Sequence, residues 1–224
     1  MRPLIVLVPD HETHSAREAC PVNTILRFAI AAPLLAAAAC SETPADAPPV
    51  TGAEWTLDGA ASDLSYVTIK AGEIAETNTF ETLTGSVAAD GAATVTIDLA
   101  SVSTGVDIRN ERMRDIFFVV ADNPSATVTA QIDPAAFETL GVGQSVETTL
   151  DGTLSLKGVE APFQAAVTVT RAGPDRVLAV SDAPVIVEAG TYNLTDGLAQ
   201  LQELAGLPSI TPVVPVTFSL VFTR

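Results

Sequence analysis

The chain is poor in the side chains that most enzymes use for chemistry. Of its 224 residues only two are histidine and two are cysteine, and all four lie at or before residue 40: His11, His14, Cys20 and Cys40. The region after residue 40 can therefore form neither a disulfide nor a Ser-His or Cys-His nucleophile pair. The usual zinc and copper sites, which depend on histidine and cysteine, are excluded there as well. We predict a non-catalytic protein with no metal and no cofactor.

Basic side chains are also scarce. Residues 40–224 carry eight of them against 24 acidic ones, so this region has the same net charge as the whole chain, −16. A surface of that sign repels phosphate backbones, and we expect no nucleic-acid partner. The acidic side chains are scattered over predicted strands and turns without clustering. An enzyme that works with carboxylates alone, such as a glycoside hydrolase, is therefore the least favoured alternative.

A long hydrophobic run is absent as well. The apolar stretch at residues 25–39 is shorter than the about 20 residues that a transmembrane helix needs. It ends on small residues before Cys40, which is typical of a bacterial lipoprotein signal that is cut before the cysteine and acylated on it. We predict a signal segment at 1–39. Residues 1–21 mix charges and prolines, whereas a start at Val22 gives a conventional signal; in that case residues 1–21 are not translated.

The expected location of the protein in the cell follows from the predicted signal segment. Residues 40–53 are rich in proline and small polar residues and predict a flexible tether behind a lipidated Cys40. We expect the protein in the bacterial periplasm, anchored to the outer membrane because Ser41 is not acidic. Without the modification of Cys40 it would be free in the periplasm or secreted.

Residues 54–224 have the sequence pattern of one all-β domain. Alternation of apolar and polar residues predicts strands at 55–58, 64–70, 79–87, 94–100, 126–132, 146–156, 163–170, 177–187 and 214–223. Asp-Gly pairs at 58–59, 90–91 and 151–152 predict tight turns. The last strand is the clearest, because it places Val214, Val216, Phe218, Leu220 and Phe222 on one face. One apolar and one polar face is what the wall of an antiparallel barrel requires.

Two helices interrupt the strands. The first is expected at 107–118, where spacing puts Arg109, Met113, Ile116 and Phe117 on one face. The second is expected at 195–205, with Thr195 as N-cap and a stop at Gly206 and Pro208.

The first of these helices holds the most unusual stretch of the chain. Three of the eight basic residues, Arg109, Arg112 and Arg114, fall within six positions and are followed by Phe117 and Phe118. An arginine-rich element between two strands predicts a cationic entrance to an apolar interior. Such an entrance suits a ligand with an anionic or polar head and an apolar tail.

Several blocks of the sequence resemble the YceI-like family of lipid-binding proteins. In order they are Trp55-Thr56-Leu57-Asp58, Ser65, Phe80, Leu83-Thr84-Gly85, Val95-Thr96-Ile97-Asp98, Ser101-Val102-Ser103-Thr104-Gly105, Arg109, Met113-Arg114, Phe117-Phe118, Pro124-Ser125-Ala126-Thr127-Val128, Gly152-Thr153-Leu154-Ser155-Leu156-Lys157-Gly158-Val159 and Pro162. The family usually has Asp directly after the first Arg, whereas this chain has Asn110. We therefore expect the acidic partner at Glu111.

The resemblance implies a lipocalin-like antiparallel eight-stranded β-barrel with one or two short helices. It also implies a ligand, an isoprenoid-type lipid such as a polyprenyl chain or a quinone, that the protein binds, stores or transports. An eight-stranded barrel is just wide enough for packed side chains or for one slender ligand. A structural or interaction protein with a packed barrel and no ligand therefore stays as the alternative. The sequence leaves the oligomeric state open, a dimer included.

The candidate ligand-binding residues are aromatic, apolar or cationic and lie on the expected inner faces or on the first helix: Phe80, Arg109, Met113, Arg114, Phe117, Phe118, Tyr192 and Phe218. The phenylalanines are either simple core or tunnel lining. The two arginines either meet the ligand head or pair with Glu111, Asp107 and Asp115. Tyr192 can reach a ligand oxygen or a backbone carbonyl.

Overall fold

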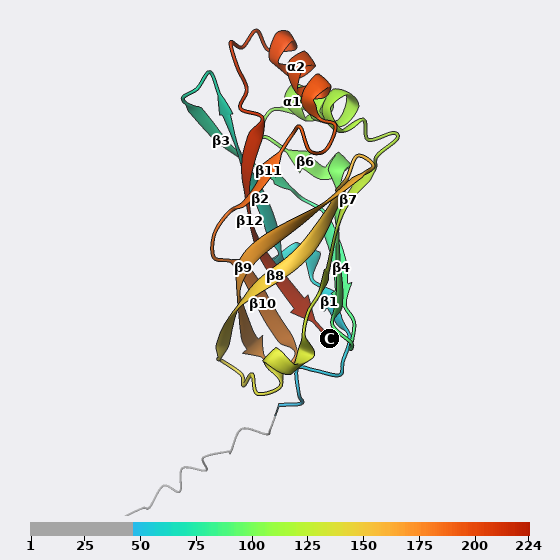
Figure 1. Ribbon diagram of the computed structural model, residues 1–224, viewed down its shortest axis with the longest axis vertical. Helices are drawn as coiled ribbons and strands as arrows, with labels where there is room; N and C mark the ends of the chain where they lie inside the picture. Colours follow the sequence, from blue (N-terminus) through green and yellow to red (C-terminus); the bar gives the residue numbers. More distant parts are fainter. Residues whose placement is uncertain (1–46) are drawn as a thin grey trace, which may run out of the picture. The chain divides into compact units, whose positions relative to one another are not determined.

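An antiparallel sheet that closes on itself forms the body of residues 47–224, the part of the chain that the computed structural model describes (Figure 1). The predicted signal segment and Cys40 lie outside the described residues. The strand segments are β1 (Trp55–Leu57), β2 (Asp63–Lys70), β3 (Ile74–Phe80), β4 (Leu83–Val87), β5 (Ala92–Asp98), β6 (Val102–Ser103), β7 (Ser125–Gln131), β8 (Ser145–Leu156), β9 (Val159–Gly173), β10 (Arg176–Ser181), β11 (Val185–Glu188) and β12 (Val213–Thr223).

These segments form eight strands, because four strands are interrupted once each. A short helix η1 (Gly59–Ala61) separates β1 from β2, and η2 (Leu99–Ser101) separates β5 from β6. Short irregular stretches separate β3 from β4 and β10 from β11. Each strand pairs with the next one along the chain, and β12 pairs back with β1 and β2 to close the barrel. The predicted eight-stranded antiparallel barrel is confirmed.

The predicted strand at 79–87 was wrong at its start and in its continuity. The strand begins at Ile74, and it breaks between β3 and β4. The first half escaped prediction because its inward side chains, Glu76 and Asn78, are polar and so give no apolar alternation.

The predicted strand at 177–187 also breaks. β10 ends at Ser181, and the Asp182 side chain accepts a hydrogen bond from the Thr168 hydroxyl at 2.7 Å. Pro184 follows and has no backbone N–H to offer a neighbouring strand. The chain therefore resumes pairing only at Val185.

Only some of the Asp-Gly pairs mark tight turns. Gly91 turns between β4 and β5 with φ of 88°, and its N–H donates to the carbonyl of Ala88. The pair at 151–152 instead lies inside β8. There the glycine makes room for an aromatic ring, because a Cβ on Gly152 would lie 2.6 Å from the Phe163 ring.

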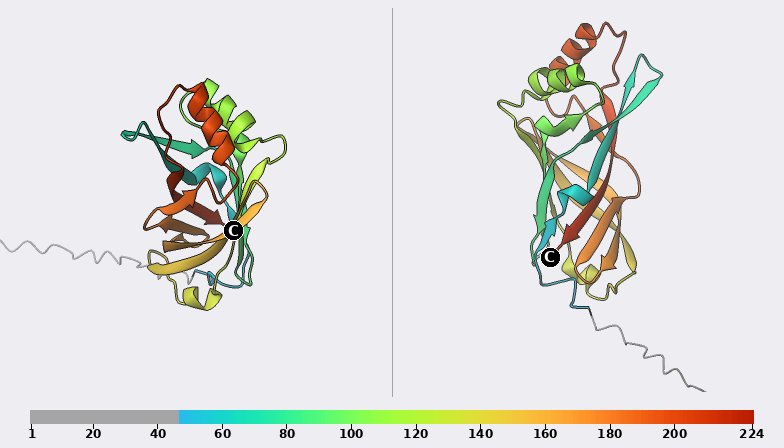
Figure 2. Two further views of the ribbon diagram at one scale, coloured as in Figure 1. Left: turned by 45° about the horizontal axis from the view of Figure 1, so that its top comes forward. Right: turned by 180° about the vertical axis from the view of Figure 1, so that it is seen from behind.

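Two helical pieces lie together at one end of the barrel and form what we call the cap (Figure 2). The first is α1 (Asp107–Arg112), which continues without a break as the π-helix η3 (Met113–Phe118). The second is α2 (Thr195–Leu204). Gly197 brings the pieces close, because a Cβ at this position would lie 3.0 Å from the carbonyl oxygen of Ile116. Both predicted helices are confirmed.

The start of α2 differs from the prediction, whereas its end agrees with it. The N-cap is Leu194, which makes no side-chain cap, so the prediction of Thr195 was wrong. At the other end Gly206 has φ of 63°, and its N–H donates to Glu203 while the N–H of Leu207 donates to Gln202. This is the pair of bonds that defines a Schellman stop.

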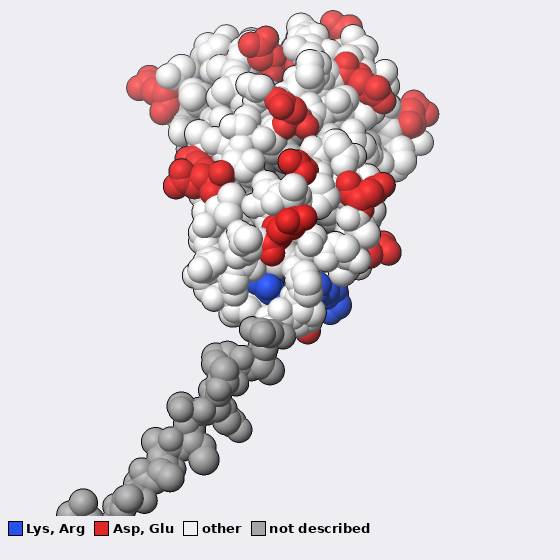
Figure 3. All heavy atoms as spheres, turned by 60° about the horizontal axis from the view of Figure 1, so that its bottom comes forward, with Lys and Arg blue, Asp and Glu red and all other residues white. Residues whose placement is uncertain are grey.

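At the opposite end of the barrel two arginines, Arg171 and Arg224, donate hydrogen bonds to backbone carbonyls. Arg171 is only 3% exposed, and its guanidinium donates to the carbonyls of Pro48, Leu140, Gly173 and Pro174. The short helix η4 (Pro134–Phe137) covers the same end. Within residues 47–224, basic side chains on the face shown in Figure 3 gather where the described chain begins, whereas acidic ones are spread widely.

Arg224 holds the start of the described chain at this end. Its guanidinium donates to the carbonyls of Pro48 and Pro49, pairs with Asp175 at 2.9 Å and lies 4.7 Å from the ring centre of Trp55. The chain therefore enters the domain at the end opposite the cap (Figure 1). Among the described residues no helix is long and apolar enough to cross a membrane.

Candidate functional site

The barrel encloses a cavity of about 840 Å³. This lies within the range of about 300–1,000 Å³ that is usual for small-molecule sites. Inner-face side chains from most strands line it and remain only partly buried, among them Phe80, Val128, Leu154, Ala161, Val169, Ala179, Val214, Val216 and Phe218. Tight packing would bury these side chains almost completely. The interior is therefore a cavity rather than a filled core.

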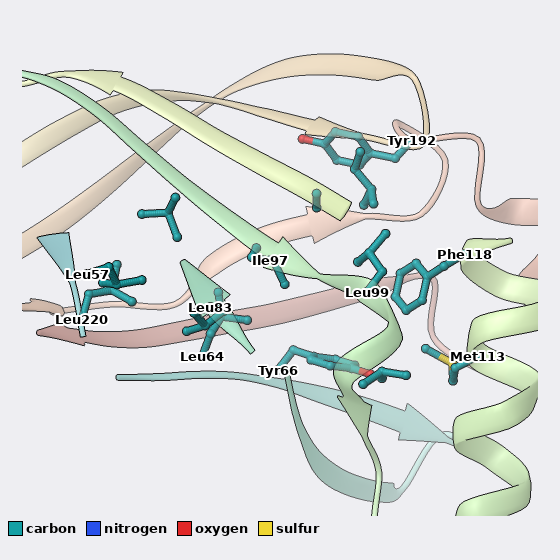
Figure 4. Packing of buried hydrophobic residues seen from close by; sticks show 14 of the residues in the cluster. Leu57, Leu64, Tyr66, Leu83, Ile97, Leu99, Met113, Phe118, Tyr192 and Leu220 are labelled. Carbon is teal, nitrogen blue, oxygen red and sulfur yellow. The ribbon is translucent and has the colours of Figure 1, made fainter. Parts of the chain in front are cut away.

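The cavity meets solvent beside the cap. Val106 and Ile108, at the start of α1, line the cavity and are 44% and 54% exposed. Further in, the walls are almost wholly apolar, and Leu99 is 1% exposed. Figure 4 shows Tyr66, Leu99, Met113 and Phe118 converging from the barrel wall and the cap.

Aromatic rings form a continuous row beneath the cap. The ring centres are 5.5 Å apart between Tyr66 and Phe80, 5.8 Å between Phe80 and Phe118, and 4.9 Å between Phe118 and Phe117. The residues come from β2, β3 and η3, so the row links the wall to the cap. All four rings line the cavity, and tilted aromatic contacts of this kind hold their positions firmly.

A polar group interrupts the apolar wall at the same place. Glu76 of β3 accepts from both Lys70 of β2 and Arg109 of α1, each at 2.6 Å. Arg109 also donates to the carbonyl oxygen of Thr104. All three charged residues line the cavity. The expected pairing of Arg109 with Glu111, Asp107 or Asp115 was wrong, because a distant strand supplies the carboxylate.

Asn110 occupies the position where the family usually has Asp, and its side chain binds Thr104 instead of an arginine. Its side-chain oxygen accepts from the backbone N–H of Thr104 at 2.9 Å and from the Thr104 hydroxyl at 2.6 Å. An amide and a carboxylate can both supply this acceptor. The bond holds the loop whose carbonyl accepts from Arg109, so Asn110 acts on the arginine indirectly.

The ion pair predicts a pH dependence of stability. A hydrogen bond from Lys70, assisted by the charge of Arg109, lowers the pKa of Glu76 below its ordinary value of 4.5. The ionised carboxylate therefore stabilises the fold above pH 4.5, and this contribution is lost as the pH falls through the lowered pKa. We expect Glu76→Gln to lower the melting temperature at pH 7 and to match the unsubstituted protein at low pH.

The exposed Glu73, on the same hairpin, provides the control for this measurement. Thermal melts of Glu73→Gln should follow those of the unsubstituted protein at every pH. A Glu76→Gln effect that persisted unchanged below the lowered pKa would show that the carboxylate charge is not responsible.

Two polar atoms near the ion pair have no hydrogen-bond partner among the atoms of residues 47–224: the Tyr66 hydroxyl and the Nε of Arg109. Both belong to residues that line the cavity. Tyr66 is 7% exposed, and burial raises the pKa of its phenol far above the ordinary value, an effect that the charge of Arg109 only partly offsets.

Seven of the eight sequence candidates line the cavity: Phe80, Arg109, Met113, Phe117, Phe118, Tyr192 and Phe218. Arg114 lies outside the lining. Sequence reasoning missed Tyr66, Lys70 and Glu76, which line it as well; Arg112, which also lines it, was expected in the cationic entrance but not among the ligand-binding candidates. Tyr66 carried a usable signal, because it shares the face of Leu64 two residues earlier. That the candidates touch a ligand stays a prediction.

The arrangement suits binding more than chemistry. It combines a long apolar chamber with one compact polar group near the opening. Residues 47–224 contain no group of three or more His, Cys, Asp or Glu placed to hold a metal ion.

Comparison with known proteins gives one family and several structures. The model of the YceI-like domain matches residues 55–222. A polyisoprenoid-binding domain from Saccharophagus degradans, implicated in plant cell wall breakdown, is 37% identical, with a TM-score of 0.74 over 76% of this chain and 98% of that chain. BcnA from Burkholderia cenocepacia is 24% identical, with a TM-score of 0.57 over 74% of this chain and 98% of its own, and shows the fold alone. No curated protein matches.

Proposed function

Because this chain belongs to the family of YceI-like domains, we propose that it binds an isoprenoid-type lipid, either a polyprenyl chain or a quinone, inside its barrel. The observation that carries the proposal is the cavity of about 840 Å³ with incompletely buried apolar walls. The similarity to the polyisoprenoid-binding domain of Saccharophagus degradans supports it. The protein then stores or transports the lipid and does not transform it.

The physical basis is the transfer of a long apolar tail out of water. Such a transfer gains about 25 cal/mol for each Å² that is buried, so a chain of several isoprene units is held without strong polar contacts. The polar group of Lys70, Glu76 and Arg109 would then select the head of the ligand. A packed barrel without a ligand is disfavoured by the incomplete burial of the inner faces.

Native mass spectrometry of the full chain purified from a bacterium, followed by organic extraction, tests the proposal. A one-to-one adduct that releases a polyprenyl compound or a quinone supports it. A clean mass for the protein alone, unchanged after incubation with added isoprenoids, contradicts it.

We further propose that the protein faces the bacterial periplasm on a lipid anchor at Cys40, in the outer membrane. The small residues before Cys40 and the absence of an acidic residue at Ser41 support this placement. A Cys40→Ser variant should move from the outer-membrane fraction to the soluble periplasmic fraction. An unchanged distribution between the fractions would rule out the anchor.

A further inference from the structure

The wall of the barrel is interrupted between β9 and β11. The pairing of β10 with β9 ends where the backbone N–H of Asp182 donates to the carbonyl of Ala166 at 2.9 Å. Past this bond the two edges have no strand between them, because β11 pairs with β12 and residues 159–165 of β9 pair with β8. We call the gap between residues 159–165 and β11 the side slot.

The cavity extends through the side slot to the outer surface. In a closed wall only alternate side chains of a strand face the interior. At the side slot, however, three consecutive residues of β9, residues 161–163, and all four residues of β11 line the cavity. Two of them, Pro162 and Ile186, are exposed on the outer face, and Ile186 is 58% exposed. The cavity therefore borders the edges of these strands as well as their inner faces, as an opening between the edges requires.

Proline keeps the two edges of the side slot from pairing. The turn at residues 157–158 joins β8 to β9, and both of its residues have positive φ, so the pair of residues that flanks it is hydrogen-bonded. Bonded and non-bonded pairs alternate along antiparallel strands, which directs the backbone nitrogen of Pro162 into the side slot. Proline has no N–H to donate there, and Pro184 directly before β11 has none either.

The side slot offers a hydrocarbon chain an apolar path through the wall. The side chains at its inner edge are apolar: Ala161, Phe163, Val185 and Val187. The opening beside the cap instead lies next to the ion pairs of Glu76, where a tail would pass charged groups. A slender chain can also move sideways through a slot without being threaded end first.

We propose that the side slot is the passage through which the lipid tail enters and leaves the barrel. The inference rests on the proposed lipid binding and deepens it. A passage sets the height of one barrier that uptake and release both cross, so blocking it slows both by the same factor and leaves the dissociation constant unchanged. A residue that holds the bound lipid changes the dissociation constant instead.

Tethering the two edges of the side slot tests the proposal. The register of β10 and β9, continued into β11, sets Ile186 opposite Pro162. The full chain with Cys20→Ser and Cys40→Ser receives Pro162→Cys and Ile186→Cys, and a cleavable bis-maleimide joins the two thiols. Native mass spectrometry then follows the transfer of a long-tailed prenylated benzoquinone, or of a polyprenyl phosphate, between phosphatidylcholine vesicles and the protein.

We expect the tether to slow uptake and release by about tenfold each, and its cleavage to restore both rates. The matched control joins Ser145→Cys to Thr170→Cys, because these residues face each other in the paired part of the wall and do not line the cavity. The control tether should change neither rate. Unchanged rates with the tether across the side slot, or a changed dissociation constant, would overturn the passage.

Ile186→Lys tests the same passage without a tether. Its ammonium group stays hydrated at this exposed position, so the fold is kept, but the tail has to pass a hydrated charge. Both rates should fall by about three- to tenfold with an unchanged dissociation constant. Ile74→Lys is the control, because Ile74 is 51% exposed and does not line the cavity.

Equal rates in Ile186→Lys and Ile74→Lys would contradict the passage while leaving lipid binding intact. Failure of the unsubstituted protein to take up either lipid from the vesicles would instead overturn the lipid-binding function itself.

Discussion

Replacing Ala179 by tryptophan is expected to abolish lipid uptake while leaving the barrel folded. Ala179 lies in β10, between Val169 of β9 and Leu220 of β12, and its side chain lines the cavity. An indole at this position projects into space that the proposed lipid tail would occupy. Because the space is not packed, the added ring gains apolar contacts instead of straining its neighbours, and the melting temperature should stay the same or rise.

Native mass spectrometry of the purified variant gives the readout. The matched control is Ala166→Trp, in which the same ring is placed on an exposed position of β9 that does not line the cavity. The control should carry as much lipid as the unsubstituted protein. Equal lipid content in Ala179→Trp would show that the tail does not occupy this part of the barrel.

Replacing Arg171 by methionine is expected to give the largest loss of stability. Methionine keeps most of the apolar stem but removes the guanidinium that donates to the carbonyls of Pro48, Leu140, Gly173 and Pro174. Hydrogen bonds from a charged donor contribute about 1.5–3 kcal/mol each, and partial access of water offsets part of the loss. We expect a decrease of about 2–4 kcal/mol in the free energy of unfolding. For a domain of this size that lowers the melting temperature by about 5–15 °C.

Denaturant titration measures the change directly. Arg176→Met serves as control, because Arg176 is exposed at the start of β10 and its charge has the same sign. Its substitution should change the free energy of unfolding by less than about 0.5 kcal/mol. A similar loss in both variants would mean that net charge, and not the carbonyl bonds of Arg171, is responsible.

The polar part of the cavity is where prediction from sequence failed, and the physical reason is specific. Apolar alternation identified the inner faces of β5 and β12 because the residues that line the cavity from those strands are apolar. On β3 the inward positions before Phe80 are Glu76 and Asn78, so this part of the strand lacks the apolar alternation by which strands are recognised. Of these two residues, Glu76 forms the polar group under the cap with Lys70 and Arg109, and Asn78 donates to the Thr68 hydroxyl beside it. Polar residues on the inner face of a barrel therefore remove the apolar alternation by which their strand would be predicted from the sequence.

The helix in the cap was predicted correctly, but its inward face was predicted with the wrong period. An α-helical spacing puts Ile116 beside Met113 and Phe117. The chain instead widens into a π-helix at Met113, and Phe118 rather than Ile116 joins the cavity wall. Such a turn is rare, and in this chain it packs closely against Gly197 of α2. The helix propensities of the residues in this segment do not predict the π-helix.

The carbonyl bonds of Arg171 and Arg224 also decide the direction in which the domain faces. They fix Pro48 and Pro49 at the end opposite the cap, so an attachment upstream holds the barrel by that end. Residues 40–46 can span at most about 25 Å, whereas β9 alone is about 50 Å long. With the proposed anchor at Cys40, the shortest path from the bilayer to the barrel leads to the end opposite the cap. A barrel that stands upright on this tether presents the opening beside α1 to the aqueous compartment.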